Sequence, residues 1–321
     1  TSVSLEQHAD TLAAAAAARN TILAELERRE GGRFQTIFPD DGPFRRELYP
    51  KHIEFFAAGA TYKERLFMKA NRVGGPRAGA FEVTCHLTGR YPDWWTGRRF
   101  HEPIEAWACG TTAETTRDIV QAELLGPVDP ASGSHTVGRG MIPAECIADT
   151  TKRPHGLPGS VESIWVRHHT GGLSVVGLKT YAQGRESFEG TAKQLIWCDE
   201  EPDEPCYTEM LYRTATVKGI TLITFTPLQG MSKVVTGFLT PERPESKQFK
   251  WFVQAGWDHV PHLDEDEKAA LIATTPPYLL DARTKGTPSL GAGAIFPIAE
   301  SDVTIKDFEL PDHWPKAFSM D

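Results

Sequence analysis

Short apolar runs alternate with helical stretches along most of the chain from about residue 49. Short, mostly apolar runs predict strands, and these are Leu66–Met68, Ile104–Cys109, Leu195–Cys198 and Ile220–Phe225, of which the last two are expected to be buried. Helices are predicted between them over residues 77–87, 116–125 and 207–216. Residues 164–166 and 173–178 flank Thr170–Gly172, which predicts a hairpin. This alternation predicts an α/β fold with a mostly parallel sheet, in which ligands bind at the carboxyl ends of the strands.

Both ends of the chain differ from this rhythm. Residues 5–30 are rich in helix formers, with Ser4 as N-cap and Gly31–Gly32 as a stop, so they predict one helix. A loop follows to residue 48. After residue 240 proline, glycine and short predicted strands dominate, with one further helix predicted at Asp264–Ala273. We therefore expect an N-terminal helix and loop (1–48), a core (49–240) and a small C-terminal subdomain (241–321).

Composition narrows the class of protein. The 321 residues include 34 basic and 43 acidic ones, a net charge of −9, and 40% are hydrophobic. This balance is that of a globular protein and excludes intrinsic disorder. Five cysteines without a CxxC pair favour reduced thiols over a disulfide scaffold. The apolar run Leu12–Ala18 is too short to span a bilayer, so no membrane role is expected.

The most informative stretch is the apolar strand that ends in three carboxylates and a proline, Leu195–Pro202. Burying a strand that ends in adjacent carboxylates is costly unless they face a cation or a polar cleft. In a nucleotide-hydrolysing site, Asp199 would hold Mg²⁺ and Glu200 would polarise the attacking water, with Glu201 as the fallback. The alternative is a strand that emerges into an acidic surface loop.

A phosphate-binding loop would have to come from another strand end, and Lys69–Arg77 follows a strand and opens a helix. Backbone N–H groups at such a junction can face an anion. The stretch departs from the standard P-loop, because Gly75 and Pro76 stand where a lysine and a hydroxyl residue are expected. Lys69, Arg72 or Arg77 could supply the missing charge. A plain glycine turn is the alternative.

A third strand end carries two hydroxyls, in Thr224–Phe225–Thr226–Pro227. Hydroxyls at that position could sense a γ-phosphate and move a neighbouring element. Threonine is common in strands, so this signal is weak on its own.

The order of these three pieces resembles the large subunit of phage terminases, the DNA-packaging motor. Further matches follow in the expected order, and they are Tyr49–Lys51, Gly184–Gly190, Gly256–Asp258, Pro261–Leu263, Arg283–Pro288 and Ile295–Pro297. The resemblance covers about residue 45 to the end. It is specific as a set, although each motif alone is not.

The resemblance implies a RecA-like ATPase of the additional-strand, catalytic-glutamate class of P-loop NTPases, followed by an RNase H-like nuclease. Residues 49–240 would be the ATPase core and 241–321 a lid or linker subdomain. The sequence ends at Asp321, which is similar to the first metal-binding aspartate of that nuclease. We therefore expect an isolated motor domain without nuclease activity.

The resemblance also implies roles for individual residues. Asp199 would bind Mg²⁺, Glu200 would be the catalytic base, and Arg185 would be an arginine finger that acts on a neighbouring subunit's nucleotide. Thr224 and Thr226 would couple hydrolysis to movement. The expected nucleotide-binding residues are Tyr49 near the adenine, then Lys69, Asn71, Arg72, Gly74, Gly75, Pro76 and Arg77. Some relatives carry a deviant loop whose lysine stands at its start, as Lys69 does here.

The implied function is Mg²⁺-dependent ATP hydrolysis that drives double-stranded DNA into a procapsid. Implied partners are the DNA, the portal protein, the terminase small subunit and further copies in a ring, in the host cytoplasm; the isolated domain could be a monomer. Two alternatives remain. One is an impaired pseudo-ATPase that acts in assembly, because of Gly75 and Pro76, and the other is a different nucleic-acid motor such as a helicase.

Overall fold

The computed structural model describes residues 33–129, 138–152 and 156–288. Its centre is an eight-stranded sheet with the order β3-β4-β5-β2-β6-β7-β1-β8. The strands are β1 (Glu64–Lys69), β2 (Glu105–Gly110), β3 (Ile147–Lys152), β4 (Val161–Arg167), β5 (Leu173–Thr180), β6 (Leu195–Asp199), β7 (Ile220–Phe225) and β8 (Lys250–Ala255).

Six of these strands, from β5 to β8 in the sheet order, run parallel, and only the β3–β4 and β4–β5 pairs are antiparallel. Strand β7 lies between β1, which precedes the glycine loop, and β6, which ends at Asp199. The register pairs Asp199 with Thr224 and Met68 with Phe225. The polar ends of β1, β6 and β7 therefore meet at one edge of the sheet, as parallel topology requires.

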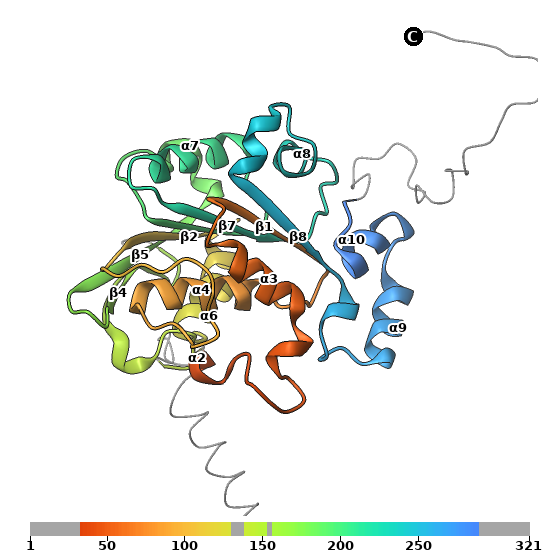
Figure 1. Ribbon diagram of the computed structural model, residues 1–321, viewed down its shortest axis with the longest axis horizontal. Coiled ribbons are helices and arrows are strands. Elements are labelled where there is room, and N and C mark those ends of the chain that lie inside the picture. Colours follow the sequence, from red (N-terminus) through yellow and green to blue (C-terminus); the bar gives the residue numbers. More distant parts are fainter. Residues whose placement is uncertain (1–32, 130–137, 153–155, 289–321) are drawn as a thin grey trace, which may run out of the picture.

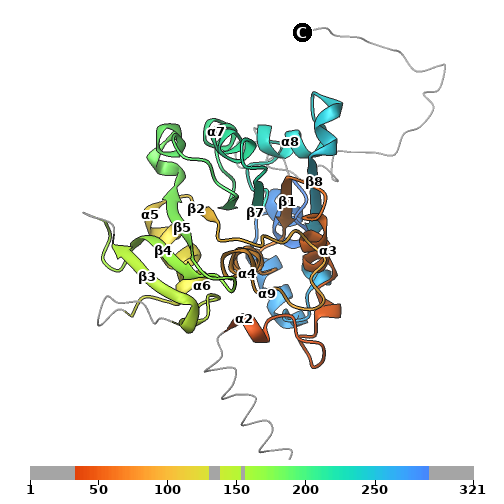
Figure 2. The ribbon, with the colours of Figure 1, turned by 60° about the vertical axis from the view of Figure 1, so that its left-hand side comes forward.

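Helices cover both faces of the sheet (Figure 1). Helices α3, α4 and α6 lie over one face, and α7 and α8 over the other, with α9 and α10 beside the carboxyl end of β8. Figure 2 shows the β3–β4 hairpin and β8 at opposite edges. The helices are α2 (Arg33–Thr36), α3 (Pro50–Ala58), α4 (Gly75–Thr88), α5 (Ala113–Thr115), α6 (Ala122–Leu125), α7 (Glu204–Ala215), α8 (Lys233–Leu239), α9 (Glu265–Thr274) and α10 (Leu280–Lys285), with a π-helical turn η2 (Thr116–Gln121) before α6.

Helix α4 is central because it follows the glycine loop and is almost wholly buried. Its start combines Gly74 in the left-handed region at φ 89° with Pro76 in the first turn, where a missing N–H costs nothing. It ends at Gly89, which has φ 67° and caps the helix in the left-handed conformation. The predicted helix between these glycines is confirmed.

The mostly parallel α/β fold is confirmed, including the apolar strands and the predicted hairpin, which is formed by β4 and β5. The sheet continues past the predicted boundary at residue 240, because β8 pairs with β1 along its whole length. Strand β3 and helix α3 were not predicted. The helix predicted over 5–30 and the motif Ile295–Pro297 lie outside the described residues. In the part that is described, no helix is long and apolar enough to cross a membrane.

Candidate nucleotide-binding site

A cleft of about 1500 Å³ opens at the carboxyl ends of the parallel strands, beside the start of α4. Most of the residues predicted for a nucleotide site line it, and these are Tyr49, Lys69, Asn71, Arg72, Gly74, Gly75, Pro76, Arg77, Glu200 and Thr226. Asp199 and Thr224 are buried behind it at the ends of β6 and β7. The topology therefore brings together three segments that are far apart in sequence.

Lys69 at the end of β1 is buried, and its side chain passes over Gly75 at the start of α4. Its Nζ lies 3.3 Å from Thr226 Oγ1 and 3.8 Å from Glu200 Oε1. A Cβ added at Gly75 would lie 2.0 Å from Lys69 Cε and 2.3 Å from its Cδ. Lys69 thus fills the space of a side chain at position 75, where a standard P-loop carries its lysine. The ammonium reaches the helix start from the other side of the loop.

The loop between β1 and α4 takes its shape from positive φ angles and from the C-terminal segment. Arg72 has φ 64° and Gly74 has φ 89°, so two residues adopt the left-handed conformation. The Asn71 carbonyl accepts a hydrogen bond from Trp257 Nε1 at 2.8 Å, and the Arg72 carbonyl accepts one from His262 Nε2 at 2.7 Å. Residues that follow β8 therefore hold this loop.

His52 on α3 contacts the backbone of this loop at Val73. It is buried, its Nε2 lies 3.0 Å from the Val73 carbonyl, and its ring meets Phe67 edge-on at 4.8 Å between centroids. Burial is the main reason that the pKa of His52 falls to about 3, and the nearby His262 and His259 add to the effect. The ring is therefore neutral at pH 7 and donates its Nε2–H to the carbonyl.

The burial of His52 predicts that acid lowers the free energy of unfolding, and that His52→Gln removes this effect. The glutamine keeps an amide N–H that can donate to the Val73 carbonyl. A histidine whose folded pKa is below its unfolded value loses stability as pH falls below the unfolded pKa, near 6.5. Relative to His52→Gln, the wild type should lose about 1.4 kcal/mol per pH unit between about 6 and 4. Urea unfolding at pH 7.5, 5.5 and 4.5 would measure it. Parallel stability profiles for the two proteins would contradict the assignment.

Asp199 ends β6 almost fully buried, and its Oδ1 accepts a hydrogen bond from Thr224 Oγ1 at 2.9 Å. Burial and then the charge of Glu200 raise the pKa of Asp199 to about 7, although Lys69 and Thr224 oppose the rise. A carboxylate in this position is stabilised by a cation.

Glu200 differs from Asp199 in reaching the cleft, where its side chain is 40% exposed. Its backbone is left-handed at φ 65°, which is uncommon for a residue other than glycine. Two contacts fix that backbone: its N–H donates to the Thr224 carbonyl at 3.0 Å, and its carbonyl accepts from Tyr181 Oη at 3.0 Å. The Asp199 carboxylate therefore lies behind the cleft, whereas the Glu200 carboxylate points into it.

These residues fit a magnesium ion. Among the described residues no group of three or more His, Cys, Asp or Glu side chains is arranged to hold a metal. Mg²⁺ in nucleotide sites usually takes one or two carboxylates together with phosphate oxygens and water. Asp199 supplies a buried carboxylate, and Glu200 and Thr226 add oxygens at the cleft. The donor set is that of a shared protein–nucleotide site.

Tyr49 lies at the side of the cleft where it packs against other rings. It meets Phe38 edge-on at 5.5 Å and stacks with His262 at 6.1 Å between centroids. Arg77 is 55% exposed and lies 3.8 Å from Glu123, a cleft carboxylate that the sequence did not identify. His52, His262 and Glu123 were all missed, and only His262 lies within a quoted motif.

Arg185 is the predicted residue that the structure places elsewhere. It lies outside the cleft lining, half exposed, with its Nη1 2.6 Å from Glu189 Oε1 and 3.4 Å from Glu209 Oε2. It therefore does not contribute to the cleft of its own chain. Its predicted role was on a neighbouring subunit's nucleotide, and it stays a prediction.

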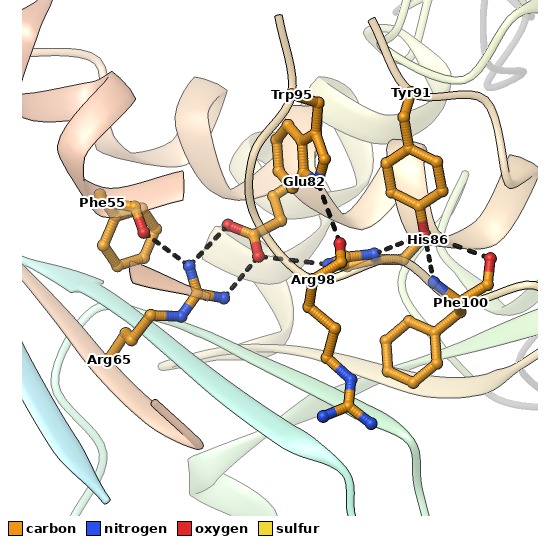
Figure 3. Close-up of polar contacts among 8 residues, drawn as sticks. All are labelled: Phe55, Arg65, Glu82, His86, Tyr91, Trp95, Arg98 and Phe100. Carbon is orange, nitrogen blue, oxygen red and sulfur yellow. Dashed lines mark hydrogen bonds and ion pairs between the residues drawn. The ribbon is translucent and has the colours of Figure 1, made fainter. Parts of the chain in front are cut away.

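A buried polar network ties together the elements around the loop (Figure 3). Arg65 on β1 donates to Glu82 Oε1 on α4 at 2.5 Å and to the Phe55 carbonyl of α3 at 2.7 Å. His86 lies 3.2 Å from the same Glu82 oxygen and 3.0 Å from Tyr91 Oη. The side chains of Arg65, Glu82 and His86 are fully buried. The network fixes β1 against α4, the two elements that the loop connects.

The mostly parallel sheet, with β7 between β1 and β6, is the RecA-like fold that the sequence predicted. Residues 66–303 match the family described as terminase large subunit, T4likevirus-type, N-terminal. The chain therefore belongs to the terminase large subunit family.

Curated relatives agree. The terminase large subunit of Salmonella phage P22 is 36% identical over 310 residues, which cover 91% of this chain and 60% of that protein. That of Enterobacteria phage LP7 is 38% identical over 108 residues, 34% of this chain and 22% of that protein. The chain thus spans at most about three fifths of the length of these relatives.

Solved structures show the same fold. A variant of the large terminase ATPase domain of Thermus phage P74-26 has a TM-score of 0.50 at 16% identity, over 74% of this chain and 95% of that one. The large terminase of bacteriophage D6E in complex with ADP has a TM-score of 0.53 at 10% identity, over 76% of this chain and 53% of that one.

Proposed function

We propose that this chain is the ATPase motor domain of a terminase large subunit, which hydrolyses ATP with Mg²⁺ to move double-stranded DNA into a procapsid. One observation carries the proposal: Lys69 Nζ lies within 4 Å of both Glu200 and Thr226, at the helix start where a phosphate chain would lie. Family membership and the ADP complex of the D6E protein support the choice of nucleotide.

Each residue then has a defined task. Lys69 and the N-terminus of α4 bind the phosphates, and Asp199 would hold Mg²⁺. Bound Mg²⁺ neutralises charge on the phosphate oxygens. Glu200 accepts a proton from the attacking water. The water oxygen bonds to the γ-phosphorus as the bond from that phosphorus to the leaving oxygen of ADP breaks. Arg185 would approach the nucleotide of the next subunit in a ring.

The partners are likewise proposals that rest on the family. Packaging requires double-stranded DNA, a portal protein and the terminase small subunit, and repeated pulling suits a ring of copies. Contacts to DNA would be directed to its backbone and would weaken as salt rises.

Lys69→Ala tests the proposal. Losing a charge-assisted hydrogen bond of about 1.5–3 kcal/mol should weaken nucleotide binding roughly 10- to 100-fold and lower turnover at least as much. Calorimetry with ATP or ADP and an ATPase assay would measure both. The matched control is Lys63→Ala, just before the opposite end of the same strand, where the ammonium lies over Phe249.

The outcomes separate the possibilities. An unchanged Lys69→Ala would transfer the phosphate charge to Arg72 or Arg77. Wild-type protein that binds no nucleotide would overturn the proposed function and favour an assembly role. Wild-type protein that binds without turnover would indicate that hydrolysis needs a neighbouring subunit.

A further inference from the structure

Trp197 lies two residues before Asp199 in β6 and donates a hydrogen bond to a residue behind the candidate site. The side chain is fully buried, and its Nε1 donates to Thr224 Oγ1 at 3.0 Å. Thr224 Oγ1 in turn lies 2.9 Å from Asp199 Oδ1. Residues two apart in a strand share a face of the sheet, so Trp197 and Asp199 reach the same neighbour on β7.

When Asp199 is ionised, as a metal-binding carboxylate is, the chemistry of these groups permits one direction only. An indole N–H donates and never accepts, whereas an ionised carboxylate only accepts. The Thr224 hydroxyl has a single proton, so it accepts from Trp197 and donates to Asp199. Without the indole N–H, that hydroxyl could rotate and donate to another acceptor.

Helix α4 is built to admit the indole. A Cβ at Gly79 would lie 2.2 Å from Trp197 Cε2 and 2.3 Å from its Nε1. Gly79 therefore provides the space that lets the N–H edge of Trp197 lie between the helix and β7. Because α4 follows the phosphate loop, the indole is held between the loop's own helix and the strand that carries Thr224.

We propose that Trp197 is a positioning residue: through Thr224 it fixes the Asp199 carboxylate in the orientation that binds a divalent cation. The inference rests on the proposed function, in which Asp199 is the metal carboxylate. The inference also assigns different roles to the two threonines that were predicted to couple hydrolysis to movement. Thr224 is committed to Trp197 and Asp199, whereas Thr226 lines the cleft beside Lys69 and is the one that faces a nucleotide.

The test measures metal affinity apart from turnover. Mn²⁺ binding to the ADP complex, followed by electron paramagnetic resonance, should weaken about 10- to 100-fold in Trp197→Phe and in Thr224→Val, as for other groups that orient metal ligands. Metal-free ADP affinity should not change. The double variant should be no weaker than Thr224→Val alone, because both substitutions break one chain of hydrogen bonds. Thr224→Ser, which keeps the hydroxyl, should retain the wild-type affinity.

Trp95→Phe is the matched control, because this buried indole donates to the Arg98 carbonyl away from the cleft. It should leave Mn²⁺ affinity unchanged. Wild-type affinity in Trp197→Phe, or a further loss when Trp197→Phe is added to Thr224→Val, would overturn the positioning role alone. Wild-type protein that binds neither ADP nor Mn²⁺ would overturn the proposed function and this role with it.

Discussion

Replacing Glu200 with glutamine is expected to slow ATP hydrolysis about 10²- to 10⁴-fold, the usual contribution of a general base. Its carboxylate reaches the cleft, whereas the Asp199 carboxylate is buried behind it against Thr224. Glutamine keeps the shape of the side chain but cannot accept the proton. Nucleotide affinity should stay close to the wild-type value, so a steady-state ATPase assay paired with calorimetry separates the base from a binding role.

The matched control is the adjacent carboxylate in Glu201→Gln. Glu201 lies outside the cleft lining and accepts a hydrogen bond from Ser232, the N-cap of α8. This variant should turn over ATP at nearly the wild-type rate. Normal hydrolysis in Glu200→Gln would refute the base assignment, and a loss confined to Glu201→Gln would move the role to that residue.

The second large effect concerns stability, in Glu82→Gln. Arg65 is fully buried, and the substitution leaves its guanidinium without a charged partner, at a cost of about 3–5 kcal/mol. Burial alone would raise the pKa of Glu82, but Arg65 and His86 outweigh it and hold the pKa below its usual value. The pair's contribution is therefore present at neutral pH and is lost as pH falls through the folded pKa. Urea unfolding at pH 7 would measure the loss.

Two comparisons make this prediction specific. Replacing both partners, in Arg65→Met with Glu82→Leu, should recover most of the loss, because no unpaired charge stays buried. Glu54→Gln removes an exposed pair with Lys51 and should cost less than about 1 kcal/mol. If Glu82→Gln lowers the free energy of unfolding by no more than Glu54→Gln does, the buried pair does not stabilise the contact between β1 and α4.

The sequence predicted those parts of the fold whose pattern is local. Strands β6 and β7 are buried along their whole length, so mostly apolar runs identified them. Strand β3 has the sequence IADTTK at an edge of the sheet and is largely exposed, and β8 has buried residues only in its second half. Strand β3 has no continuous apolar run and β8 has only the short run Trp251–Val253, and their places are set by pairing with β4 and β1.

The candidate site was predictable as a set of strand ends and not as a set of contacts. A glycine loop after one strand and carboxylates after another indicate a shared edge, because parallel strands end on the same side. Sequence could not show that Trp197 contacts Thr224 or that His262 binds the Arg72 carbonyl, since these depend on register and on a segment far along the chain. The left-handed backbone of Glu200 is likewise set by tertiary contacts.

The packing of Lys69 over Gly75 also couples positions 69 and 75 of this loop. A lysine acquired at position 75 would displace the Lys69 side chain, because its Cβ would lie 2.0 Å from Lys69 Cε. A chain that first loses Lys69 has no ammonium beside Thr226. The effect of a lysine at position 75 is therefore expected to depend on which residue stands at position 69.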